Sequence, residues 1–224
     1  MRNFFGIYQY VTPGLVFPLT YWLWLNRYHG NHAFVLFILS IPIVFSYVIP
    51  ALGTNWLGLW EINTRVRLGK FRPHHGFLFG TGTSLLALLC FDSPEFSPFG
   101  LFRSALVLAS VLGFWNWIYD IYAIDCGFIT AYNQSYAEGK GAEAIATEHA
   151  PVYFGTFGFL YGLMLNTAQH YLLDLGKMSL YWPLLILFIA ISLVLPSLAF
   201  IGLSFLRHGH SGLKPFEKGT PIGG

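Results

Sequence analysis

Residues 180–206 read LYWPLLILFIAISLVLPSLAFIGLSFL and contain no Asp, Glu, Lys or Arg. An α-helix that crosses the hydrocarbon core of a bilayer, roughly 30 Å thick, needs about 20 mostly apolar residues. Strands of a membrane barrel would alternate apolar and polar side chains over about ten residues, and this segment does not alternate. The segment therefore predicts a transmembrane helix and indicates the fold class of the chain.

Five more segments are free or nearly free of charged residues: 8–26, 33–56, 76–91, 101–124 and 151–173. Only 10% of the 224 residues are charged, against about 25% in a typical soluble domain. Segment 76–91 is short for a span unless its helix begins near Phe71 or the segment is re-entrant. We expect an all-α, polytopic integral membrane bundle of about six transmembrane helices. Residues 1–210 would form one domain, and residues 211–224, with four glycines, a flexible cytoplasmic tail.

The basic residues predict the orientation of this bundle. If the N-terminus lies inside, only Arg27, Arg103 and Lys177 of the 12 basic residues face outward. The others share the inner side: Arg2, Arg65, Arg67, Lys70, Arg72, Lys140, Arg207, Lys214 and Lys218. Because cytoplasmic loops carry an excess of Lys and Arg, we expect a multi-pass protein with both termini in the cytoplasm. The net charge of +2 is ordinary for such loops and does not indicate a nucleic-acid partner.

Two predicted cytoplasmic loops, 57–75 and 126–150, are long enough to hold structure of their own. The first suits an amphipathic helix on the membrane surface, anchored by Trp60 and Phe71. In the second, residues 139–148 predict a turn followed by a short helix.

The most informative polar residues lie near the end of segment 101–124, in the sequence FWNWIYDIYAID of residues 114–125. Polar and ionised groups at membrane depth are energetically unfavourable, so they usually have a partner or a function. Asn116 and Asp120 are four residues apart and share a helix face, whereas Asp125 points elsewhere or follows the helix end. In the predicted topology Asp120 lies at the inner edge of the hydrocarbon, level with both cytoplasmic loops.

These positions define the candidate site, a polar mouth under an aromatic-lined bundle. The candidate catalytic residues are Asp120, Glu61, His74, His75, Asp125 and Asn116. The candidate substrate-binding residues are Arg65, Arg67, Arg72, Trp115, Trp117, Tyr119, Tyr122, Asn133, Glu148 and His149.

A carboxylic acid held among aromatic rings loses solvation, which favours the protonated form that a general acid needs. Aromatic faces also stabilise cations, which suits acid-initiated isoprenoid chemistry with Asp120 or Glu61 as proton donor. The arginines of the 57–75 loop would then hold an anionic headgroup or anchor the loop. Alternatively, Asp120 forms an ion pair with one of these arginines and only holds the loop in place.

The eight histidines do not show the tandem spacing expected of a membrane di-iron site, so we expect no metal site and no cofactor. Cys90 and Cys126 fall on opposite sides of the predicted bundle and are not expected to form a disulfide. His170 and Asn166 share a helix face, where either an interhelical hydrogen bond or ligation of a pigment or haem is possible.

Three functions fit these features. The first is an integral membrane enzyme that acts on an isoprenoid or other lipid-like substrate by proton transfer, such as cyclisation, hydration or isomerisation. The second is a non-catalytic subunit or assembly factor of a membrane complex that holds pigments or quinones. The third is a transporter or channel, which the lack of an internal repeat disfavours. The expected partners are membrane lipids and the bilayer, with a homo-oligomer or a larger complex also possible.

Overall fold

The computed structural model of the protein describes residues 1–92 and 96–217, and this part of the chain is mostly helical. The elements follow in the order α1 (Arg2–Val11), η1 (Thr12–Val16), α2 (Phe17–Arg27), α3 (His32–Ala51), η2 (Leu52–Trp56), β1 (Trp60–Ile62), α4 (His75–Cys90), α5 (Pro98–Asp125), β2 (Ile129–Ala131), α6 (Gln134–Ala137), α7 (Ala142–Thr147), α8 (Ala150–Ala168), η3 (Gln169–Asp174), η4 (Met178–Leu180) and α9 (Tyr181–His208). The segments η1, η2 and η3 are π-helical turns that continue an α-helix, and η4 is a single 3₁₀ turn.

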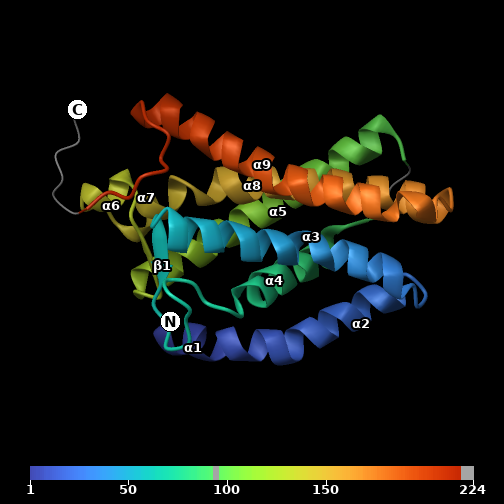
Figure 1. Cartoon of the computed structure of the whole chain (residues 1–224), viewed down its shortest axis with the longest axis horizontal. Helices are drawn as coiled ribbons and strands as arrows, with labels where there is room; N and C mark the ends of the chain where they lie inside the picture. The colour runs from blue at the N-terminus through green and yellow to red at the C-terminus, as the bar shows by residue number, and fades with distance from the viewer. Residues whose placement is uncertain (93–95, 218–224) are drawn as a thin grey trace.

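In the described part of the chain, three helical segments are long and apolar enough to cross a membrane, namely His32–Trp56, Pro98–Asp125 and Met178–His208. The helix His75–Cys90 is apolar but shorter. For these three segments, the prediction of helices with the length and apolar composition of a membrane span is therefore confirmed. Figure 1 shows α3, α5, α8 and α9 running along the long dimension of the molecule, with β1, α6 and α7 gathered at one end.

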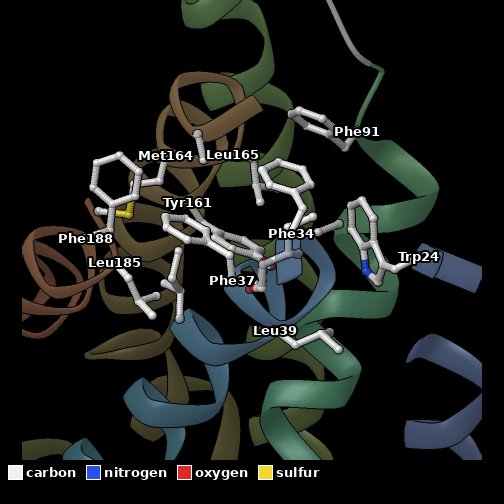
Figure 2. Packing of buried hydrophobic residues seen from close by; sticks show 14 of the residues in the cluster. Trp24, Phe34, Phe37, Leu39, Phe91, Tyr161, Met164, Leu165, Leu185 and Phe188 are labelled. Carbon is white, nitrogen blue, oxygen red and sulfur yellow. Dashed lines mark hydrogen bonds between the residues drawn. The ribbon is translucent and has the colours of Figure 1, made fainter. Parts of the chain in front are cut away.

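The main core lies between α2, α3, α4, α5, α8 and α9 and is rich in aromatic rings. Figure 2 shows Phe34 and Phe37 of α3 close to Tyr161 of α8. The buried polar atoms of two large rings are satisfied by backbone carbonyls. Trp24 donates to the oxygen of Ser84 at 3.1 Å, and Tyr161 donates to the oxygen of Ile38 at 3.0 Å. These bonds tie α2 to α4 and α8 to α3 away from solvent, where an unpaired polar group would be costly.

Helices α5 and α8 approach each other closely through small residues. A Cβ atom on Gly158 would overlap the backbone of Leu108, and one on Gly162 would lie 2.8 Å from the Cα of Ala105. Small residues four apart let two helix backbones come together in this way. The Gly158-x-x-x-Gly162 spacing therefore serves packing within the molecule.

The 57–75 loop does not form the predicted surface helix. Residues 60–62 form β1, which pairs antiparallel with β2 so that Trp60 lies opposite Ala131 and Ile62 opposite Ile129. Gly58 and Gly69 adopt positive φ angles of 66° and 63°, a conformation that interrupts a helix and that glycine adopts without strain. Phe71 is buried rather than inserted in lipid. The all-α description is thus corrected by one two-stranded ribbon.

The 126–150 loop agrees with the sequence more closely. A turn with Gly139 at a φ of 71° precedes α7, which lies within the predicted residues 139–148. The described start of the tail folds back beside this loop, because Gly209 ends α9 in a left-handed conformation and the amide of Phe216 donates to the oxygen of Tyr132 at 2.8 Å. The flexibility predicted for residues 211–224 stays a prediction, and residues 218–224 lie outside the described residues.

Candidate functional site

A cavity of about 350 Å³ lies where α3, α5, α8 and α9 meet the β1–β2 ribbon and the first residues of the tail. Its wall is mostly apolar, with large contributions from Phe45, Phe79, Phe154, Phe200 and Ile201. This volume is near the lower end of the range of about 300–1,000 Å³ that is usual for small-molecule sites. The few polar groups on the wall are the natural candidates for chemistry.

Asp120 and His149 form a pair on the cavity wall. Nε2 of His149 lies 3.1 Å from Oδ2 of Asp120, and the exposed fractions of the two side chains are 28% and 8%. Asp120 sits on the buried face of α5, and His149 is the residue directly before α8. The close packing of α5 on α8 brings these two positions together. An imidazole hydrogen-bonded to a carboxylate can hold or transfer a proton at one ring nitrogen while the other is oriented by the acid.

His75 and Arg72 form a second pair, at the start of α4. One terminal nitrogen of Arg72 lies 2.9 Å from Nδ1 of His75, and the other donates to Oε1 of Gln9 at 3.3 Å. Arg72 is fully buried and its guanidinium lies 5.0 Å from the ring centre of Phe128. Burial lowers the pKa of Arg72, and the nearby hydroxyl of Tyr119 opposes that effect. His75 lines the cavity, whereas Arg72 lies behind it.

Tyr132 brings a third polar group to the wall. Its hydroxyl donates to Oε1 of Glu61 on β1. Burial raises the pKa of Tyr132, and the hydrogen bond to Glu61 raises it further. Next to it, Asn133 accepts from the amide of Tyr136 at 3.1 Å and donates to the oxygen of Ile145 at 2.8 Å. Glu61 therefore reaches the cavity only through Tyr132, while Asn133 both lines the cavity and starts α6.

Tyr153 and Ser197 line the cavity as well, and their hydroxyls lie 2.9 Å apart across α8 and α9. Sequence reasoning did not single out Tyr132, Tyr153 or Ser197. The position of Tyr153 could have been found, because it follows His149 by four residues and shares its helix face. No comparable signal in the sequence points to Ser197.

Of the candidate residues, the structure brings Asp120, His149, His75 and Asn133 to the cavity wall. Asp120 does not pair with an arginine of the 57–75 loop, because its partner is His149. That alternative is wrong in this structure. Arg65 and Arg67 are exposed to solvent, so neither arginine faces the cavity.

The remaining candidates lie outside the cavity. Asn116 donates to the oxygen of Leu112 in its own helix at 2.7 Å, and Asp125 is exposed at the end of α5. Glu148 accepts from the amide of Ser135 at 2.7 Å. Asn116 and Glu148 are thus hydrogen-bonded to backbone groups, and none of these three polar side chains lines the cavity.

His74 and the aromatic candidates are also placed elsewhere. His74 stacks on Tyr10 at 5.4 Å, and burial followed by the charge of Arg72 lowers its pKa. The aromatic candidates have the following surroundings: Trp115 is 54% exposed, Tyr122 is 46% exposed, Trp117 donates to Thr147 and Tyr119 packs on Phe5. The aromatic lining of the cavity comes from other rings, above all Phe45, Phe79 and Phe154.

Among residues 1–92 and 96–217, no three His, Cys, Asp or Glu side chains cluster in a way that could hold a metal ion. Cys90 and Cys126 are free thiols. Asn166 donates to Gly162 in its own helix at 3.1 Å, and the ring of His170 stacks on Phe96 at 3.9 Å.

Comparison of the chain with family models, with curated proteins and with solved structures gives no match.

Proposed function

We propose that the protein is an integral membrane enzyme that acts on an isoprenoid or other lipid-like substrate by acid–base chemistry. The reaction would be a cyclisation, hydration or isomerisation in which a proton moves to or from a carbon or oxygen of the substrate. The observation that carries the proposal is the Asp120–His149 pair, set 3.1 Å apart on the wall of a largely apolar cavity.

The pair has the arrangement that proton transfer needs. When Nε2 of His149 carries a hydrogen it donates to Asp120, which leaves Nδ1 as an acceptor for a substrate proton. Asp120 then acts as the orienting group, in the way that a buried carboxylate fixes the tautomer of a catalytic histidine. Polar side chains at such a site are hydrogen-bonded in place, so they need little rearrangement during the reaction.

The apolar wall supports a hydrocarbon substrate. Phe45, Phe79 and Phe154 present ring surfaces to the cavity, and burial of apolar surface contributes roughly 25 cal/mol per Å². Ring faces would also stabilise positive charge that develops on an isoprenoid after protonation. This assigns to these rings the role that the sequence suggested for the tryptophans and tyrosines of residues 115–122.

We propose six spans with both termini cytoplasmic: 2–27, 32–56, 75–90, 98–125, 150–174 and 178–208. The three segments suited to cross a membrane support the second, fourth and sixth of these spans. The position of β1, α6 and α7 at one end of the molecule (Figure 1) supports a common side for the two long loops. The cavity lies at that end, because the ribbon forms part of its wall.

The cavity also favours an enzyme over a non-catalytic subunit, for which a bundle packed without a cavity is expected. A homo-oligomer or a larger complex stays a prediction.

The test compares wild-type protein with Asp120→Asn, which keeps the shape of the side chain and removes the negative charge. Both are expressed in the same host, and membrane lipids are compared by mass spectrometry. We expect a product that appears with the wild type and falls by about 10²-fold or more with Asp120→Asn, as for loss of the carboxylate that orients a catalytic histidine.

Asp174→Asn is the matched control, because Asp174 is exposed at the far end of η3. It should leave the product unchanged. Equal product with wild type and Asp120→Asn, in preparations with the same thermal unfolding temperature, would end the proposal.

A further inference from the structure

We propose that the cavity binds a neutral lipid that carries a carbonyl or hydroxyl oxygen, and that His75 donates a hydrogen bond to this oxygen. Arg72 acts as a positioning residue that holds the His75 imidazole in the donating tautomer. This inference rests on the proposed function and specifies its substrate class. It also assigns to His75 a role separate from that of the Asp120–His149 pair.

The tautomer of His75 follows from its contact with Arg72. A guanidinium has only donors and stays charged in proteins, so the 2.9 Å contact must be a hydrogen bond from Arg72 to Nδ1 of His75. Nδ1 is then without a hydrogen. A neutral imidazole carries its single hydrogen on the other nitrogen, so the remaining polar atom of this ring, Nε2, is a donor.

The ring that carries this donor belongs to the cavity wall. His75 is 6% exposed and stacks on Phe79, with 5.2 Å between the ring centres, and both residues line the cavity. Arg72 is itself held by Gln9 and by the ring of Phe128. A preorganised donor of this kind suits an oxygen that is bound or that gains negative charge during a reaction.

The charges of the wall indicate a neutral ligand. The residues that line the cavity in the described part of the chain include no Lys or Arg, and their one carboxylate is Asp120. A phosphate would need several charge-assisted hydrogen bonds to offset its loss of solvation. It would instead face the carboxylate of Asp120. The predicted role of Arg65 and Arg67 in holding an anionic headgroup is therefore not retained in this proposal.

The experiment uses the full-length protein in detergent and two probes of similar hydrocarbon size, geranylacetone and geranyl phosphate. Affinity is measured by competition with a fluorescent fatty alcohol, and the carbonyl stretch of bound geranylacetone is measured by infrared difference spectroscopy. We expect geranylacetone to bind at least about tenfold more tightly than geranyl phosphate, a difference of about 1.4 kcal/mol. A donor to the carbonyl should move its stretch to lower frequency.

Two variants of His75 separate hydrogen bonding from packing. His75→Phe should lower the affinity for geranylacetone by about tenfold, within the range for one buried hydrogen bond. It should also abolish the shift of the carbonyl stretch. His75→Gln retains an N–H donor and should keep the shift. His170→Phe makes the same replacement outside the cavity and should leave both affinity and frequency unchanged.

Two variants of Arg72 test the positioning role. Arg72→Lys can only donate to Nδ1, so the frequency shift should remain. Arg72→Gln can also accept from Nδ1, which permits the other tautomer, so the shift should shrink or disappear. This pair decides the question even if His75→Phe does not fold, since equal shifts in the two variants would overturn the role of Arg72.

The proposal is overturned if wild-type protein does not bind geranylacetone, if geranyl phosphate binds more tightly, or if folded His75→Phe keeps the shift. These outcomes are independent of turnover. A carbonyl shift without any product that depends on Asp120 would end the proposed enzyme activity and leave the binding inference intact. A product that depends on Asp120, without a shift of the carbonyl stretch, would overturn the proposed role of His75 and leave the proposed enzyme activity intact.

Discussion

At the scale of single residues, Arg72 is a buried cation that donates to two uncharged acceptors, Gln9 and His75. Burial of a charge is unfavourable unless hydrogen bonds and nearby dipoles compensate it. The ring of Phe128 and the hydroxyls of Tyr119 and Tyr8 supply part of this compensation. The residue therefore ties the 57–75 loop to α1 and α4 and is expected to matter for stability.

We expect Arg72→Leu to lower the free energy of unfolding by about 1–3 kcal/mol, the range for a buried polar group that loses its hydrogen-bond partner. The reason is that Nδ1 of His75 loses its donor, whereas Oε1 of Gln9 keeps the hydroxyl of Thr64 as a donor at 2.9 Å. Thermal unfolding in detergent measures the effect. Arg67→Leu is the control, because Arg67 is exposed, and an equal loss in both variants would contradict the argument.

His74 gives a prediction for pH. Burial and the charge of Arg72 lower its pKa below the ordinary value of about 6.5. A group with a lowered folded-state pKa stabilises the protein above its unfolded pKa, and this contribution is lost as pH falls through the folded pKa. His74→Phe should therefore lose less stability than wild type between about pH 7 and pH 5, as measured by thermal unfolding at each pH. The same loss in both proteins would show that His74 does not contribute.

At the scale of elements, the close packing of α5 on α8 determines the candidate site. Gly158 meets the backbone of α5 without room for a Cβ, whereas a Cβ on Gly155 would lie 3.8 Å from the oxygen of Ala109. The contact at these glycines sets the register of the two helices. Further along the same pair of helices, this register places His149 beside Asp120. The pair depends on helix packing and not on either segment alone.

Gly158→Ala should lower the free energy of unfolding by about 1–3 kcal/mol, because overpacking forces the backbones apart. It should also lower any activity that depends on the Asp120–His149 pair. Gly155→Ala has room for its methyl group and should be neutral or slightly stabilising, since alanine is favoured over glycine in a helix by about 1 kcal/mol. Thermal unfolding of the two variants checks the difference, and a greater loss in Gly155→Ala would contradict it.

At the scale of the whole molecule, the proposed topology places Lys140 and Lys177 on opposite sides of the membrane. Both side chains are exposed in the described structure, so each can be replaced by a reporter cysteine once Cys90 and Cys126 are changed to serine. An impermeant maleimide added to intact bacterial spheroplasts should label Lys177→Cys, and Lys140→Cys should react only after lysis. Labelling of both from outside, or the reverse order, would contradict the predicted orientation.

Composition and hydrophobicity predict a mostly helical chain and the approximate limits of its long apolar helices, and both agree with the structure. Hydrophobicity and charge are local properties, so segments such as 33–56 and 180–206 can be recognised without knowledge of their neighbours. The same reasoning identified Asp120 and His149 as candidates, but it assigned them to a broad mouth and did not pair them.

Which candidate residues contact one another depends on how the helices pack. Asp120 and His149 are 29 residues apart, and their contact depends on the register of α5 and α8 at small residues. The loop at 57–75 has a pattern compatible with a surface helix. In the structure, however, residues 60–62 pair with residues 129–131, and this ribbon provides hydrogen-bond partners for their backbone groups. The burial of Arg72 and the tautomer of His75 follow from contacts between α1, the loop and α4, and no local pattern encodes contacts of that kind.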